Sequence, residues 1–115
     1  MRIRTNFMNT LTRNIEAWGL DRGLLDQDPV PQTVKLMEEV GELAEGIIKQ
    51  RPEQIKDSIG DAVVVLTILA QQCGLSLNDC VEHAYQEIKN RKGKMVDGIF
   101  VKEGDIQPEV VGDTR

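Results

Sequence analysis

Carboxylates in two short segments are the residues of this chain that could do chemistry. The first segment carries four glutamates and the second carries two aspartates: Glu38, Glu39, Glu42 and Glu45, then Asp57 and Asp61. In an α-helix each residue is turned by about 100° from the one before, so the first, third and fourth glutamates would share one side, with the second at its flank. The two aspartates are one turn apart and would also share a face. If two helices carrying these acids pack antiparallel, as the short connection at residues 49–52 favours, the acids could converge.

The second segment changes from acidic to apolar along one helix face. Directly after Asp61 comes an apolar run, in which Val64 and Ile68 continue the face that Asp57 and Asp61 begin. A carboxylate at the edge of buried surface is costly unless it is paired, and the neighbours here are acids rather than cations. A divalent cation would resolve this conflict, and hard oxygen ligands suit Mg²⁺ or Mn²⁺, which also bind substrate phosphates. The alternative is an acidic stripe that is simply solvated.

Four helices are predicted to position these residues. The spacing of apolar side chains predicts helices over residues 7–19, 31–51, 52–73 and 76–93, with a loop over 21–31. Pro31 and Pro52 suit the first turns of the second and third helices, and Gly74 can close the third. The fourth helix would turn apolar side chains inward and end at a basic run that complements its dipole. These are Val81, Ala84, Tyr85 and Ile88, then Lys89, Arg91 and Lys92.

A small appendage is predicted after the helices. The dipeptide Asp97-Gly98 lies between two short apolar runs and favours a tight hairpin. Residues from 102 onward have no such pattern. We therefore expect an all-α chain with a four-helix-bundle-like core and a small C-terminal β-hairpin, organised as one helical domain over residues 1–101 and a tail over 102–115.

Composition narrows the possible partners. The chain has 115 residues and a net charge of -5, which disfavours a nucleic-acid-binding surface because phosphate neutralisation needs clustered Lys and Arg. No apolar stretch approaches the roughly 20 residues that cross a bilayer, and the first residues lack a signal-peptide core, so we expect a cytoplasmic protein without a membrane partner. The third helix is apolar on several faces and a unit this small has little interior, which predicts a homodimer or homotetramer.

The two acidic segments also resemble a known family. EEVGELAE at residues 38–45, followed by SIGD at 58–61, is similar to the MazG-like, all-α nucleoside triphosphate pyrophosphohydrolases, and the likeness extends over residues 15–101. The signature of that family is E-x-x-D on one helix, preceded by E-E-x-x-E on another. The resemblance implies metal ligation by Glu39, Glu42 and Asp61, with Glu38 as the first acid of the pattern.

The chain departs from this signature at one position. Where the family has a glutamate, this chain has Ser58, with Asp57 immediately before it. Because Asp57 shares a face with Asp61, we expect it to complete the metal site, directly or through a water. The resemblance implies Mg²⁺-dependent cleavage of NTPs or dNTPs between the α- and β-phosphates, giving a nucleoside monophosphate and pyrophosphate. Glu38 is the candidate general base, since it is not fully used in ligation.

Substrate contacts are expected from two other places. The family carries an Asn and basic residues after its last core helix, which Asn90, Arg91 and Lys92 resemble, and charged donors there could hold the triphosphate. The alternative for these cations is a role at the helix terminus alone. Trp18 could stack a nucleobase, but its spacing with Leu11 and Ile15 favours core packing.

Two other classes of protein remain open. Residues 70–92 resemble a helix-turn-helix with Gly74 at the turn, which would make the protein a DNA-binding repressor. Its recognition helix would then begin with Asp79 and Glu82, and negative charge there opposes DNA phosphates. In the other class, the protein is a non-catalytic helical partner whose acidic face is an interaction surface.

Overall fold

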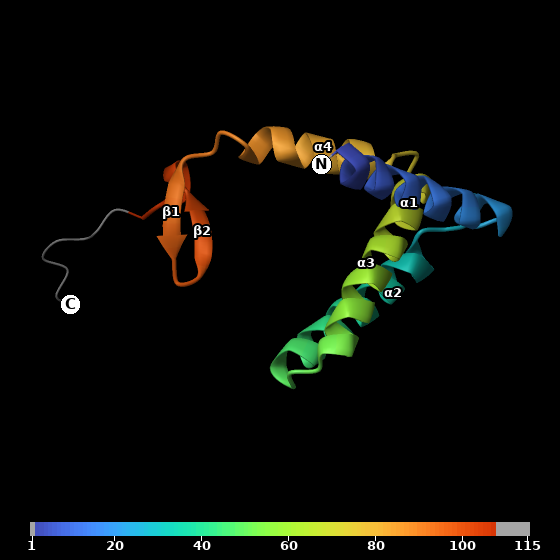
Figure 1. Ribbon diagram of the computed structural model, residues 1–115, viewed down its shortest axis with the longest axis horizontal. Helices are drawn as coiled ribbons and strands as arrows, with labels where there is room; N and C mark the ends of the chain where they lie inside the picture. The colour runs from blue at the N-terminus through green and yellow to red at the C-terminus, as the bar shows by residue number, and fades with distance from the viewer. Residues whose placement is uncertain (1, 108–115) are drawn as a thin grey trace, which may run out of the picture. The chain divides into compact units, whose positions relative to one another are not determined.

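The computed structural model describes the backbone of residues 2–107 and the side chains of residues 7–107. Within this part of the chain the fold is all-α with a small two-stranded hairpin, which confirms the predicted class (Figure 1). Two compact units are present, residues 1–81 and 82–115. The elements are α1 (Arg2–Asp21), α2 (Val30–Ile48), α3 (Pro52–Gln72), α4 (Leu77–Ile88), β1 (Gly93–Val96), β2 (Ile99–Lys102) and a 3-10 turn, Glu103–Asp105.

An antiparallel pair, α2 and α3, forms the centre of the first unit. Each helix has a proline at its first turn, as predicted. The second helix ends at Ile48, three residues earlier than expected, because Gln50 takes a left-handed conformation with φ 56° and turns the chain. The Arg51 amide then donates to the Gly46 carbonyl at 2.8 Å, which closes the helix end. The two helices lie side by side along their length (Figure 1).

The close approach of these helices depends on Gly46. A Cβ at this buried position would lie 3.2 Å from Ile55 Cγ1 and 3.3 Å from its backbone nitrogen. The least exposed positions of the second helix include Leu36, Glu39 and Leu43, at the three- and four-residue steps that lead to Gly46. A glutamate therefore lies on the inner stripe of α2, where the sequence placed it only at the flank of the acidic side.

The first helix packs against the C-terminal half of α3 (Figure 1). The Gln71 side-chain amide donates to the Glu16 carbonyl at 3.1 Å, and that of Gln72 donates to the Leu24 carbonyl at 2.9 Å. The apolar side chains buried in the described part of the chain all belong to α3: Val65, Ile68 and Ala70. The core is therefore centred on the helix whose apolar run the sequence singled out.

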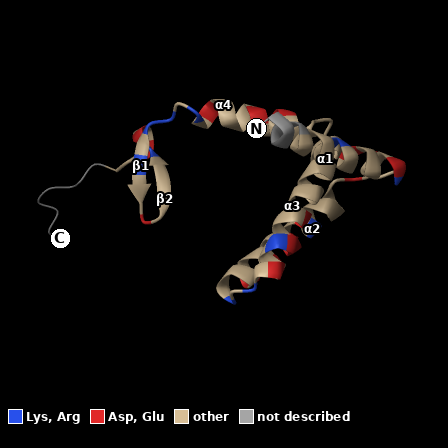
Figure 2. Cartoon of the chain, viewed as in Figure 1, with Lys and Arg blue, Asp and Glu red and all other residues tan. Residues whose placement is uncertain are grey.

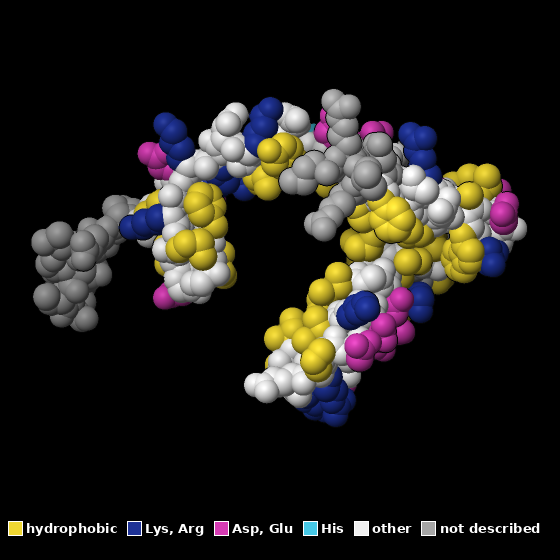
Figure 3. Space-filling model, viewed as in Figure 1, with side chains coloured by type: hydrophobic (Ala, Val, Ile, Leu, Met, Phe, Trp, Pro, Cys, Tyr) yellow, Lys and Arg dark blue, Asp and Glu magenta, His cyan; other side chains and the backbone are white. Residues whose placement is uncertain are grey.

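Much of the remaining apolar surface is uncovered in the single chain. Met37, Ile48 and Ile59 of the central pair are exposed, Ile48 by 79%. Hydrophobic side chains are visible on the surface of this helix pair (Figure 3). No single described helix is both long and apolar enough to cross a membrane; only α3 and α4 taken together, across the break between them, have the length and composition. The apolar side chains of the α2–α3 pair are thus only partly used for packing within one copy.

The fourth helix differs from the prediction in two ways. No residue of α4 is buried, so Val81, Tyr85 and Ile88, expected inward, are exposed. The helix also ends at Ile88 rather than near Gly93, because the chain turns there, with the Arg91 amide donating to the Ile88 carbonyl at 2.9 Å. The apolar side chains of α4 therefore form an exposed stripe rather than an inward face.

The hairpin forms as predicted. Val96 pairs with Ile99, which leaves Asp97 and Gly98 as a two-residue turn with φ 51° and 82°. The strands reach further than the two apolar runs, since Gly93 pairs with Lys102. Residue 102 and the 3-10 turn after it are therefore structured, and residues 108–115 of the predicted tail lie outside the described part.

Candidate active site

Antiparallel packing brings acids of both segments to one groove. The groove lies between α2 and α3, has a volume of about 520 Å³, and is lined by Glu42, Glu45, Gln54, Asp57, Ser58 and Asp61. Acidic side chains gather on one edge of this helix pair, with a basic side chain beside them (Figure 3), and the cartoon shows the same neighbours on α3 (Figure 2). The predicted convergence of the acids is thus present in the backbone arrangement. Glu38 and Glu39 are not among the lining residues.

Glu39 is the buried acid of the cluster. Its side chain is only 6% exposed, and its Oε2 is buried without a hydrogen-bond partner. Its other oxygen, Oε1, lies 3.8 Å from the Lys35 Nζ. Burial raises the pKa of this carboxyl, and the nearby charges of Glu42 and Asp61 raise it further, against a lowering effect of Lys35. Glu39 is therefore coupled to the groove electrostatically, although it does not line it.

Glu45 lines the groove and is fully partnered. Its Oε1 accepts a hydrogen bond of 2.9 Å from the Gln54 amide, and its carboxylate pairs with Lys49 at 3.4 Å and Arg51 at 3.6 Å. The Gln54 hydrogen bond, followed by the charge of Lys49, lowers the pKa of Glu45. The same Gln54 nitrogen donates to the Glu42 carbonyl at 2.9 Å, which ties the start of α3 to α2.

Sequence reasoning missed Gln54. No motif marks it, although it lies one turn before Ser58 on the side of α3 that faces α2. That position was the available signal, because an amide at a helix crossing can bridge a carboxylate and a backbone carbonyl at once.

Ser58 and Asp57 take different places in the groove. Ser58 is 1% exposed and lies on the stripe of α3 that packs against α2. Asp57 is exposed and lines the groove together with Asp61. The same face then becomes part-buried at Val64 and buried at Ile68, so the predicted change from acid to apolar is confirmed. Asp57 is the carboxylate that reaches the groove from this turn of the helix.

Comparison with known proteins agrees with this arrangement. A family model described as the MazG nucleotide pyrophosphohydrolase domain matches residues 30–96, more than half of the chain. The chain belongs to this family. A curated relative, an uncharacterized 18.2 kDa protein in the rep-hol intergenic region of Haemophilus phage HP1 (strain HP1c1), is 53% identical over 66 residues. That match covers 56% of this chain and 40% of the relative, and no solved structure matched the chain.

The MazG match contains all six acids of the two segments and the residues 90–92, whereas α1 lies outside it. The relative is itself uncharacterized, so the match assigns the family of nucleotide pyrophosphohydrolases and no more. The metal, the substrate and the catalytic residues therefore have to be inferred from the residues of the groove.

The donor set of the groove fits a hard divalent cation. Glu39 Oε2 is a buried oxygen without a partner, and Glu42 and Asp61 are close enough to raise the Glu39 pKa. Carboxylate oxygens of this kind are the ligands that Mg²⁺ and Mn²⁺ prefer. Within the described residues, no three acidic, His or Cys side chains form a ready-made cage for a metal ion. Like charges repel, so carboxylates at the exposed rim turn toward water unless a cation draws them together.

The predicted substrate contacts are found in different units. Trp18 is 43% exposed, which contradicts the expected core packing, and the Arg22 guanidinium lies 4.2 Å from its ring centroid. Asn90, Arg91 and Lys92 are exposed in the turn between α4 and β1, in the second unit. The basic run therefore does not belong to the last turn of the helix, where it was expected to complement the dipole.

Proposed function

We propose that this MazG-family chain is a Mg²⁺-dependent nucleoside triphosphate pyrophosphohydrolase that acts on NTPs or dNTPs. The observation that carries the proposal is the buried Glu39, whose unpartnered oxygen and raised pKa indicate that the fold tolerates an unfavourable charge. It does so at the position where the family signature has a metal ligand. A carboxylate that served only stability would have a partner for that oxygen.

The reaction is hydrolysis of the anhydride between the α- and β-phosphates. A water adds to the α-phosphorus, the bond from this phosphorus to the α,β-bridging oxygen breaks, and pyrophosphate leaves with that oxygen. The water oxygen stays on the nucleoside monophosphate, and its proton passes to a base. Mg²⁺, with Mn²⁺ as a substitute, supplies charge neutralisation on the phosphate oxygens when it is bound. Glu39, Glu42 and Asp61 would hold the ion, and Asp57 would complete the site directly or through a water.

Proton transfer and substrate binding require further residues. Glu38 is exposed beside Glu39, and of the charges that act on Glu39 it shifts the Glu39 pKa least. It is the candidate for the group that accepts the proton of the attacking water. Asn90, Arg91 and Lys92 are proposed to bind phosphates, and Trp18 to stack against the base.

The test is pyrophosphate release from a panel of NTPs and dNTPs in the presence of Mg²⁺. Glu39→Ala and Asp61→Ala should abolish release, whereas Glu53→Ala removes an acid from the first turn of α3, outside the groove, and should leave it unchanged. Each product mixture should contain the matching monophosphate. No release from any nucleotide, or full activity in both Glu39→Ala and Asp61→Ala, would overturn the proposal. Salt-sensitive, sequence-selective DNA binding in place of hydrolysis would favour the repressor instead.

Association of copies is also proposed. The exposed side chains Met37, Ile48 and Ile59 lie on the helix pair that carries the site, and water contact of such surface is unfavourable. A homodimer or homotetramer would cover it. Sedimentation should give a mass above 12.9 kDa, and Ile48→Glu should shift the species toward the monomer. A monomeric wild-type protein would contradict the proposal.

A further inference from the structure

A second hollow adjoins the acidic groove within the first unit. It lies between α1 and α3 and has a volume of about 510 Å³. Its walls include Met8, Leu11 and Ile15 on one side, and Lys56, Asp57 and Asp61 on the other. The two aspartates also line the acidic groove, so the groove and the hollow meet at these residues.

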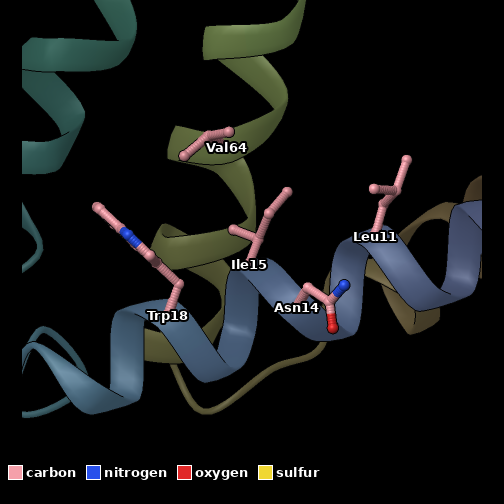
Figure 4. Close-up of a pocket in the computed structure, with 5 residues that line it drawn as sticks. All are labelled: Leu11, Asn14, Ile15, Trp18 and Val64. Atoms are coloured by element: carbon pink, nitrogen blue, oxygen red, sulfur yellow. The ribbon is translucent and has the colours of Figure 1, made fainter.

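A third hollow, of about 390 Å³, continues this surface along α1. It shares Leu11, Ile15 and Val64 with the second hollow and adds Asn14 and Trp18. The side chains of Ile15 and Trp18 rise from α1 on the side where Val64 of α3 lies (Figure 4). The three depressions therefore form one surface that changes from acidic, through a single lysine, to apolar and aromatic.

Lys56 stands out among the cations of the helix pair. Residues 30–72 contain four basic side chains, and three of them, Lys35, Lys49 and Arg51, pair with glutamates of α2. Lys56 is exposed and forms no ion pair with a carboxylate in the described part of the chain. Its ammonium group is thus available to an anion at the point where the acidic groove opens into the apolar hollow.

We propose that Lys56 binds the phosphate chain of the nucleotide, and that the hollow between α1 and α3 seats the sugar against Leu11 and Ile15 with the base toward Trp18. The inference rests on the proposed function, since it assigns a residue and an orientation to the same site. A nucleotide is anionic at one end and flat and apolar at the other, which is the order of surfaces from Asp61 to Trp18.

The position of Trp18 supports this orientation. Arg22 lies over the indole ring and donates a hydrogen bond of 3.2 Å to the Trp18 carbonyl, and it is not among the described residues that line the third hollow. The guanidinium therefore restrains the ring without occupying the hollow. A restrained aromatic ring loses little conformational freedom when a base stacks on it.

Trp18 is the only tryptophan of the chain, so its fluorescence reports directly on this hollow. The probes are α,β-methylene nucleoside triphosphates, which resist cleavage, and the matching nucleosides, titrated with Mg²⁺ present. We expect the triphosphate analogue to change the fluorescence of the wild-type protein. Lys56→Met keeps most of the aliphatic stem and removes the charge, so it should raise the Kd of the triphosphate analogue about tenfold and leave the Kd of the nucleoside unchanged.

Two control variants sharpen the result. Lys56→Arg should restore binding to within about threefold of wild type, because the charge is kept. Lys49→Met removes a cation that pairs with Glu45 and does not line the hollow, so it should leave nucleotide binding unchanged. Equal losses of nucleoside and triphosphate binding in Lys56→Met would indicate packing of the stem and overturn the role in phosphate binding. Unchanged binding would overturn it as well.

A steric variant tests the hollow without touching a charge. Gly60 lines the hollow, and an added Cβ there would meet no atom within 4 Å. Gly60→Ala should therefore fold with an undiminished Tm and still weaken binding of the triphosphate analogue several-fold. Unchanged binding in this variant, or calorimetric binding of the analogue without a Trp18 signal, would place the nucleotide elsewhere. If the wild-type protein hydrolyses nucleotides but shows either of these two results, only this inference is overturned. If the wild-type protein neither binds nor cleaves any nucleotide, the proposed function is overturned and this inference with it.

Discussion

Two glutamates of the same helix show how differently one acidic surface can be used. Glu39 is buried, has an oxygen without a partner, and has a pKa raised by burial and by its acidic neighbours. Glu45, six residues later, is exposed, has three partners, and has a pKa lowered by the Gln54 hydrogen bond. The carboxylate of Glu39 is thus held buried without a full set of partners, which does not stabilise the fold. That of Glu45 fastens the connection between the two helices.

The contrast separates function from stability within one cluster of acids. Groups with unfavourable protonation states gather at functional sites, whereas groups with complete sets of partners are more often structural. Glu39 also belongs to the E-E-x-x-E pattern through which the sequence resembles the MazG-like family, and Glu45 lies outside that pattern. A variant at each glutamate should therefore affect different properties of the protein.

The largest expected difference is between Glu39→Gln and Glu45→Gln. Loss of the Glu39 charge should lower pyrophosphate release about 100-fold or more, since the proposed metal ligand is removed. It should also raise the Tm in the absence of metal, because an ionised buried group is replaced by a neutral one. Glu45→Gln should keep activity within about threefold and lower the Tm. Rates and thermal melts of both variants test this comparison. It would be contradicted if Glu45→Gln lost more activity than Glu39→Gln, or if Glu39→Gln lowered the Tm and Glu45→Gln raised it.

A second difference, of intermediate size, is expected within α3. Asp57→Asn should weaken the Mn²⁺ or Mg²⁺ affinity about tenfold if the exposed carboxylate completes the site. Ser58→Ala should change it less than about twofold, because the side chain at this position is almost fully buried. Metal titration followed by calorimetry measures both. A larger loss of metal affinity in Ser58→Ala than in Asp57→Asn would indicate that the ligand lies at position 58, where the family pattern has its glutamate.

The pKa of Glu39 predicts opposite pH responses with and without metal. Its pKa is raised in the fold, so the folded chain binds this proton more tightly than the unfolded chain, and without metal the stability should decrease as pH rises through that window. With saturating Mg²⁺ the carboxylate must be ionised, so the stabilisation by metal should be lost as pH falls, starting above the ordinary glutamate value of 4.5. Melts across pH should show both trends, and Glu39→Gln should remove them.

The sequence predicted the backbone part of this site well. Helical spacing placed the acids of two helices on facing surfaces, and the prolines at positions 31 and 52 located the helix starts. The turn Asp97-Gly98 located the hairpin. These features depend on local periodicity and turn chemistry, which are properties of neighbouring residues along the chain.

The burial of individual side chains could not be predicted in the same way. Which acid of the Glu38-Glu39 pair turns inward depends on a rotation of α2 that Gly46 permits by its close contact with Ile55. The exposure of Trp18 depends on how α1 crosses α3. Such rotations and crossings are decided by packing between distant segments. Periodicity along the chain therefore predicts which face of a helix a residue lies on, but not how deeply it is buried on that face.

The smallest expected effect concerns the turn after α2, whose basic residues pair with Glu45 and not with Glu39. Gln50 has φ 56°, a conformation that a side chain disfavours and glycine adopts freely. Gln50→Gly should raise the free energy of unfolding by about 1 kcal/mol, and Gln50→Ala, which keeps the Cβ, should give no comparable gain. Because this turn carries the Lys49 and Arg51 partners of Glu45, the gain should appear in denaturant unfolding while metal affinity stays the same. A change in metal affinity would show that Glu39 and Glu45 are coupled through the turn, and the separation drawn between them would then fail.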